Sequence, residues 1–102
     1  MAISKDLVEV ILERTREWKL QWSELSRNGF TSEIAAHSIT IDLIGPGQYT
    51  LTIADERGNV LERVEASARS VDALWEIYNL ARRQALRVDD ALLTLRRKLE
   101  EL

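Results

Sequence analysis

Cysteine is absent from this chain of 102 residues, and histidine and proline occur once each. The lack of cysteine excludes disulfide bonds and thiolate metal sites. The lone histidine, His37, leaves little material for acid-base catalysis. No apolar run approaches the roughly 18 residues that cross a bilayer, and the N-terminal residues lack the basic-then-apolar layout of a signal peptide. We therefore expect a cytoplasmic protein without membrane contact.

The composition, 45% hydrophobic and 30% charged, is typical of a globular domain rather than a disordered chain. We expect one domain over residues 1–102. The net charge of −3 is unevenly spread. Residues 30–66 carry six acidic and two basic side chains, whereas residues 67–102 carry six acidic and seven basic side chains. A general attraction to nucleic acid is therefore not indicated, and any anion site belongs to the C-terminal third.

Alternating apolar residues predict a three-stranded antiparallel meander between Ile39 and Val64. Its two turns are Gly45-Pro46-Gly47 and the segment 55–59, which suits a type I turn followed by a left-handed glycine. This spacing predicts that Ile41 lies opposite Leu51 and that Ile53 lies opposite Leu61. Whether residues 30–37 form a strand stays open, because their apolar parity conflicts with that of the meander.

Amphipathic helical patterns flank the meander on both sides. The first predicts one long N-terminal helix that ends at Asn28-Gly29, since both residues tolerate the left-handed conformation. The second predicts a helix from a cap at Ser70 to about Leu86, and a third helix follows from Asp89. The expected fold class is therefore α+β, with a long N-terminal helix, a three-stranded antiparallel meander and two C-terminal helices packed on one sheet face.

No motif predicts catalysis. Ser38 and Asp42 share a strand face that His37 leaves, so the three side chains do not form a hydrolytic set. The acidic pairs at 55–56, 89–90 and 100–101 lack the spacing of a calcium loop and suit turns and helix ends instead. We expect no catalytic residue, metal or cofactor. A pocket formed by His37, Asp42 and Trp22 would favour a small enzyme or ligand-binding domain instead.

Aromatic residues lie on the predicted helical stripes, where a core needs bulk. We expect them to pack internally, and Trp22 is the best candidate for an exception because it lies near a helix end. They are Trp18, Trp22, Trp75 and Tyr78.

The sheet face opposite the helices is expected to be too apolar for plain solvent contact and too polar for a core, a character typical of interfaces. Its predicted interaction residues are Thr40, Thr50, Thr52, Val60 and Val64. The first hypothesis is a non-catalytic protein–protein interaction module, a small bacterial-type adaptor or accessory subunit that associates with a protein partner or with itself. The alternative is a nucleic-acid or anionic-ligand binding domain that uses basic residues of the C-terminal helices, namely Arg83, Arg87, Arg96 and Arg97.

Overall fold

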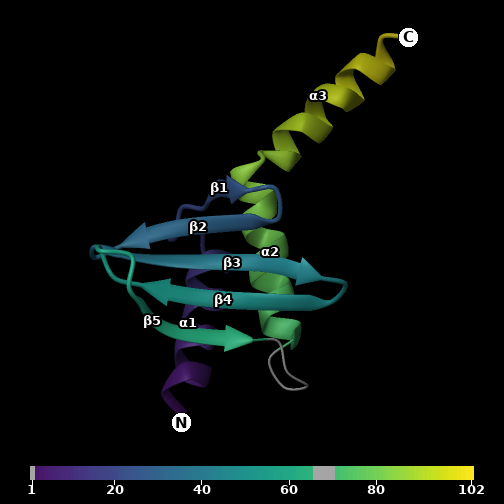
Figure 1. Ribbon diagram of the computed structural model, residues 1–102. Coiled ribbons are helices and arrows are strands. Elements are labelled where there is room, and N and C mark those ends of the chain that lie inside the picture. Colours follow the sequence, from purple (N-terminus) through teal and green to yellow (C-terminus); the bar gives the residue numbers. More distant parts are fainter. Residues whose placement is uncertain (1, 66–70) are drawn as a thin grey trace.

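The computed structural model describes residues 2–65 and 71–102 and has an α+β fold with one antiparallel sheet (Figure 1). Neighbouring strands in the sheet are also neighbours in sequence, in the order β1-β2-β3-β4-β5. The elements are α1 (Ala2–Arg16), β1 (Ser23–Ser26), β2 (Gly29–Ile34), β3 (His37–Gly45), β4 (Gln48–Ala54), β5 (Val60–Glu65), α2 (Val71–Ala85) and α3 (Val88–Glu100). The predicted cap Ser70 lies outside the described residues.

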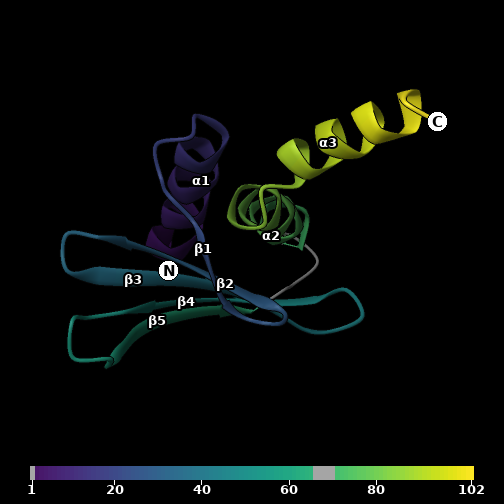
Figure 2. The same ribbon diagram turned by 90° about the horizontal axis from the view of Figure 1, so that it is seen from above.

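The helices are distributed unequally around the sheet. Figure 2 shows α1 and α2 side by side over one face, here called the inner face, while the opposite outer face carries no helix among the described residues. The third helix, α3, extends away from the sheet and buries none of its residues. None of the described helices combines the length and apolar character that a bilayer crossing requires.

The predicted architecture is therefore wrong in three respects. The sheet has five strands rather than three, the N-terminal helix is short, and only one of the two C-terminal helices packs on the sheet. Residues 23–34, expected in part as helix, form the first hairpin of the sheet. The Asn28-Gly29 pair lies in and after the turn of that hairpin instead of ending a helix.

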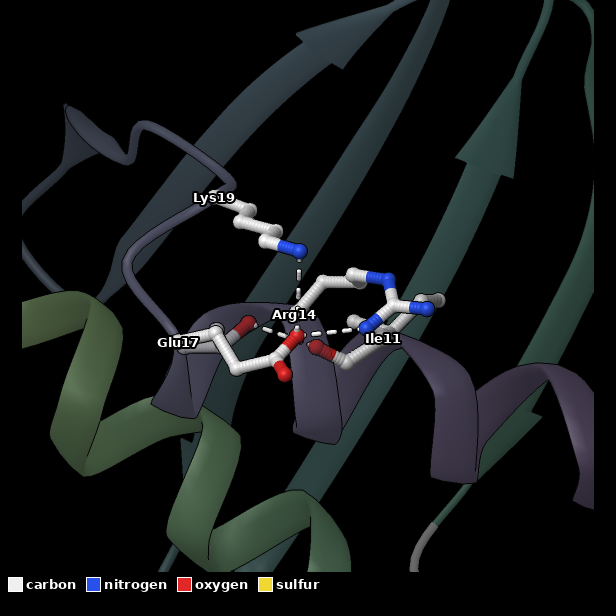
Figure 3. A network of polar contacts seen from close by, with 5 residues as sticks. Ile11, Arg14, Glu17 and Lys19 are labelled. Carbon is white, nitrogen blue, oxygen red and sulfur yellow. Dashed lines mark hydrogen bonds and ion pairs between the residues drawn. The ribbon is translucent and has the colours of Figure 1, made fainter.

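The end of α1 explains the largest of these differences. Trp18 adopts a left-handed backbone with φ of 60°, its amide donates to the carbonyl of Thr15 at 3.1 Å, and the amide of Lys19 donates to Arg14 at 2.9 Å. These two bonds make a Schellman motif, which normally places glycine at the left-handed position. Glu17 accepts contacts from the side chains of Arg14 and Lys19 at the same helix end (Figure 3). Because tryptophan occupies the position where glycine is usual, the sequence does not indicate that the helix ends here.

A second left-handed turn resolves the parity conflict around residue 36. Ala35 and Ala36 have φ of 51° and 61° and connect the paired residues Ile34 and His37. Positive φ at both central residues defines a type I′ turn, the connection that matches the twist of paired strands. The apolar parity changes because the chain reverses here. Alanine gives no hint of this turn, since Asn-Gly or Gly-Gly is the usual signal.

The register prediction is confirmed in one hairpin and wrong in the next. Ile41 pairs with Leu51, as predicted. In the β4–β5 hairpin Ala54 pairs with Val60 and Ile53 pairs with Glu62, so the pairing shifts by one residue at a bulge. The bulge reverses the two faces of β5 relative to the prediction.

The core lies between the inner face and the two covering helices. An aromatic cluster marks one contact of α2 with the sheet, where the Tyr78 ring centroid lies 5.4 Å from Phe30 and 5.4 Å from Tyr49. The largest fully buried side chains are Phe30, Ile41, Leu51, Leu74 and Ile77.

Trp22 joins the end of α1 to α2 beside this core. Its backbone amide donates to Gln84 Oε1 at 2.7 Å, and its indole Nε1 donates to Thr15 Oγ1 at 3.2 Å. Thr15 in turn donates to the carbonyl of Ile11. Trp22 is therefore a core residue, and the suggestion that it lines a ligand site is wrong.

Residues Ala35 and Ala36 generate the first testable prediction. Left-handed backbone costs an ordinary L-residue about 1–2 kcal/mol, so Ala35→Asn with Ala36→Gly should raise the free energy of unfolding by about 1–2 kcal/mol. Urea denaturation measures the change. As a control, Gly58→Ala at φ of 87° should lower stability by about 1 kcal/mol. An unchanged or lower stability in the Asn-Gly variant would contradict the type I′ turn.

The β5 register generates the second. Val64 is half-buried against the core, whereas its neighbour Arg63 is exposed on the outer face. Val64→Glu should lower the free energy of unfolding by about 1–3 kcal/mol, because a charge replaces apolar packing. Arg63→Glu should change it by less than about 0.5 kcal/mol. If denaturant titrations showed a larger loss of unfolding free energy for Arg63→Glu than for Val64→Glu, the register predicted from the sequence would be correct instead.

Candidate functional site

The residues considered for catalysis do not converge. His37 is exposed at the start of β3, with its Nδ1 atom 2.6 Å from the carbonyl oxygen of Ala35. Asp42 belongs to the other face of the same strand, and Trp22 is buried beside α1 and α2. The pocket that would have favoured an enzyme or ligand-binding domain is therefore not formed by these residues.

His37 does line an open hollow of about 340 Å³ where the β2–β3 and β4–β5 turns meet. Its other lining groups include the carboxylates of Glu33, Asp55 and Glu56. Asp55 is occupied by the turn itself, since its Oδ1 accepts the backbone amides of Arg57 and Asn59 at 2.9 Å each. Across residues 2–65 and 71–102, no three His, Cys, Asp or Glu side chains are arranged to hold a metal ion.

The outer face of the sheet is polar and rich in threonine. Strand pairing aligns Thr31, Thr40, Thr52 and Arg63 in one row, and Thr40 Oγ1 donates to Thr31 Oγ1 at 3.3 Å. A second row contains Asp42 and Thr50. Four of the five predicted interaction residues therefore share this face, namely Thr40, Thr50, Thr52 and Val60. Val64 does not, because the bulge turns it toward the helices.

Asp42 has the most perturbed environment on the outer face. Its Oδ1 lies 2.3 Å from the position that a Cβ on Gly29 would occupy, so a larger residue at position 29 would have to displace the Asp42 carboxylate. Burial raises the pKa of Asp42. Desolvation with no charged partner identified is a cost of packing and does not by itself indicate chemistry.

The basic residues predicted to bind anions are largely matched with carboxylates. Arg83 lies 2.5 Å from Asp89, and Arg87 lies 2.8 Å from Asp90. Both arginines line a hollow of about 250 Å³ together with the exposed Trp18. The other two predicted residues lie farther along α3, where Arg96 pairs with Glu100 at 2.9 Å. The four residues do not form one unpaired basic cluster.

The most unusual surface of the described chain is α3 itself. Its leucines at positions 92, 95 and 99 are 53%, 54% and 58% exposed. These leucines recur at helical spacing, and no described part of the chain covers them. Periodicity in the sequence shows which face of a helix is apolar, but it does not show whether a partner surface is available to that face.

The exposed tryptophans give a related correction. Tyr78 packs internally as expected and Trp22, the expected candidate for an exception, does so too, whereas Trp18 is 58% exposed and Trp75 is 53% exposed. Trp18 leaves the predicted stripe because the Schellman motif changes the chain direction at that residue. Trp75 shares α2 with fully buried neighbours at Leu74 and Ile77 but occupies the other side of the helix.

No protein-family model, curated protein or solved structure matches this chain.

Asp42 generates the third testable prediction. Because its pKa is raised in the folded protein, the folded state keeps its proton to higher pH than the unfolded state, and stability falls as pH rises through that range. Asp42→Asn should therefore raise stability at pH 7. Its advantage should disappear near about pH 2, where Asp42 is protonated in both states.

Asp55→Asn is the matched control with the opposite sign. Hydrogen bonds, of which the one from the Asn59 backbone amide has the largest effect, lower the pKa of Asp55. The charged carboxylate therefore stabilises the fold at pH values above the range in which Asp55 titrates. This variant should lose stability at pH 7 and lose less in acid. Urea titrations across pH measure both variants, and a destabilised Asp42→Asn protein at pH 7 would contradict the burial argument.

Proposed function

We propose that this chain is a non-catalytic protein–protein interaction module, acting as a small adaptor or accessory subunit. The observation that carries the proposal is α3, a helix of 13 residues that buries none of them and carries a row of half-exposed leucines. Apolar residues gathered on one face of an exposed surface mark protein interfaces, whereas scattered ones need no explanation.

The energetics of an isolated helix support this proposal. Helices shorter than about 12–15 residues are marginal in water, and most helical stability in proteins comes from burial of an apolar face. α3 makes exposed ion pairs such as Arg87–Asp90 and Arg96–Glu100, each worth only about 0.3–0.5 kcal/mol. Arg87, the residue just before α3, has a φ of 53°. This left-handed conformation is unfavourable for a residue that carries a Cβ atom. Burial of the leucines by a partner supplies the missing stabilisation.

The outer face of the sheet is a second candidate surface. Its residues Thr40 and Thr52 are half-buried and Thr50 is buried, and no described helix covers this face. Tight interfaces depend on a few buried aromatic, arginine or large apolar anchors, and this face has few such groups. We therefore rank α3 above it.

The anion-binding alternative also has one supporting feature. Trp18 lies with Arg83 and Arg87 around one hollow, so an aromatic ring is available beside basic groups. The two arginines already pair with Asp89 and Asp90, and an anion has to compete with those carboxylates. Binding that falls steeply with salt would favour this alternative.

A photo-crosslinking experiment tests the proposal. A photoreactive phenylalanine analogue replaces Leu95 on the leucine row, Arg97 on the opposite side of α3, or Thr52 on the outer face, in cells that normally produce the chain. Protein adducts at position 95 and none at position 97 are expected, because only the apolar side of α3 should lie in an interface. Adducts at position 52 alone would show that the interface lies on the outer face of the sheet instead of on α3. The absence of adducts at both 95 and 52 would contradict an interaction module.

A further inference from the structure

Four residues of α3 form a stripe with the spacing of a helix-pairing seam. Val88, Leu92, Leu95 and Leu99 follow one another at intervals of four, three and four, here called the leucine stripe. This spacing is the a/d pattern of coiled coils, in which each residue packs against a second helix. The three leucines are about half exposed, so the described chain offers them no second helix.

Three charged side chains of α3 flank the stripe, whereas Asp90 and Arg97 lie on the opposite side of the helix. At 100° per residue, Asp89 and Arg96 follow the stripe on one side and Lys98 follows it on the other. The side that carries Asp89 and Arg96 is self-complementary when the helix is paired with a reversed copy of itself, because two-fold symmetry brings the same flank of both copies together.

One antiparallel register satisfies both the stripe and the charges. If the two-fold axis lies between Leu93 and Thr94, Val88 packs with Leu99 of the second copy and Leu92 with Leu95. The same register brings Asp89 within about 3 Å, measured along the helix axis, of the level of Arg96 of the second copy, on the same side of the seam. This pair occurs twice by symmetry and joins opposite charges, and the opposed helix dipoles add to the match.

The competing arrangements lose this pair. In a parallel pair in register, Arg96 faces Ala91 of the second copy, so Asp89 and Arg96 do not meet. A shift of one heptad in the antiparallel pair keeps apolar layers but brings Arg96 beside Arg96 of the second copy, or Asp89 beside Asp89. Like-charge juxtaposition is a common device against wrong pairing.

We propose that a second copy of this chain covers α3, forming an antiparallel helix pair with Val88–Leu99 and Leu92–Leu95 layers. The proposal rests on the interaction-module function and identifies its partner. The seam spans about two heptads, fewer than the three or four of a stable independent coiled coil, so association should be weak and is best measured from about 1 μM to about 1 mM.

The absence of native cysteine permits a direct test of the pairing. Val88→Cys and Leu99→Cys variants of the full chain are prepared separately and oxidised alone or as a mixture. In the proposed pair, Val88 and Leu99 of the second copy are neighbours, while two copies of position 88 are about 16 Å apart along the axis. A disulfide requires Cα atoms within about 7 Å. The mixture should therefore give a disulfide dimer, and each variant alone should stay monomeric.

Two matched variants test what drives association. Leu95→Asp, on the stripe, should weaken dimerisation at least about tenfold in sedimentation equilibrium, whereas Leu93→Asp, similarly exposed but off the stripe, should change it less than about threefold. Asp89→Lys should also weaken it, and mixing that variant with an Arg96→Glu copy should restore it. Circular dichroism at low concentration checks that each variant keeps its fold.

Each outcome decides between named alternatives. Disulfide dimers from the single variants alone would show a parallel pair and overturn the register. A monomer up to about 1 mM, with no disulfide in the mixture, would overturn the second copy as the occupant. The interaction module would survive that result if position 95 still crosslinks to a different protein in cells, and it would fail only if positions 95 and 52 both give no adduct.

Discussion

The width of the sheet limits how much helix the fold can bury. Four steps between five strands span about 19 Å, and a helix of 15 residues, the length of α1 and of α2, spans about 22 Å. Both helices run across the strands (Figure 1). α1 ends at Arg16, and the chain turns back toward the sheet after the left-handed Trp18. α3 is the helical segment for which the sheet has no room.

The two covering helices are also held to each other. Arg16 donates from Nε and Nη2 to the two carboxylate oxygens of Glu76 at 2.6 Å each, a bidentate pair between α1 and α2. This pair lowers the pKa of Glu76 and raises that of Arg16. It lies at the surface and contributes less than the apolar contacts beneath it, but its fixed geometry aligns the two helices.

Sequence reasoning succeeded where the local chemistry was explicit and failed where an unusual residue took a special backbone conformation. The β3–β4 hairpin followed from Gly45-Pro46-Gly47 and a clean alternation. Trp18 and the Ala35-Ala36 turn adopt left-handed backbone that usually signals glycine or asparagine, so one helix was predicted too long, β1 was missed and the assignment of β2 stayed open. The α3 leucines were visible as a pattern, but their exposure depends on the space left on the sheet, which no local pattern encodes.

The sequential order of the strands has a consequence for the order of folding. Each strand pairs with the next through a short turn, so the sheet forms by closing small loops and bears little of the entropy cost of distant contacts. The α1–α2 contact is different, because Arg16 and Glu76 are 60 residues apart. During synthesis all five strands precede α2, so the hairpins can assemble while the part of the apolar inner face that α2 covers is still exposed. The nascent chain is most exposed to misassociation in the interval before α2 docks.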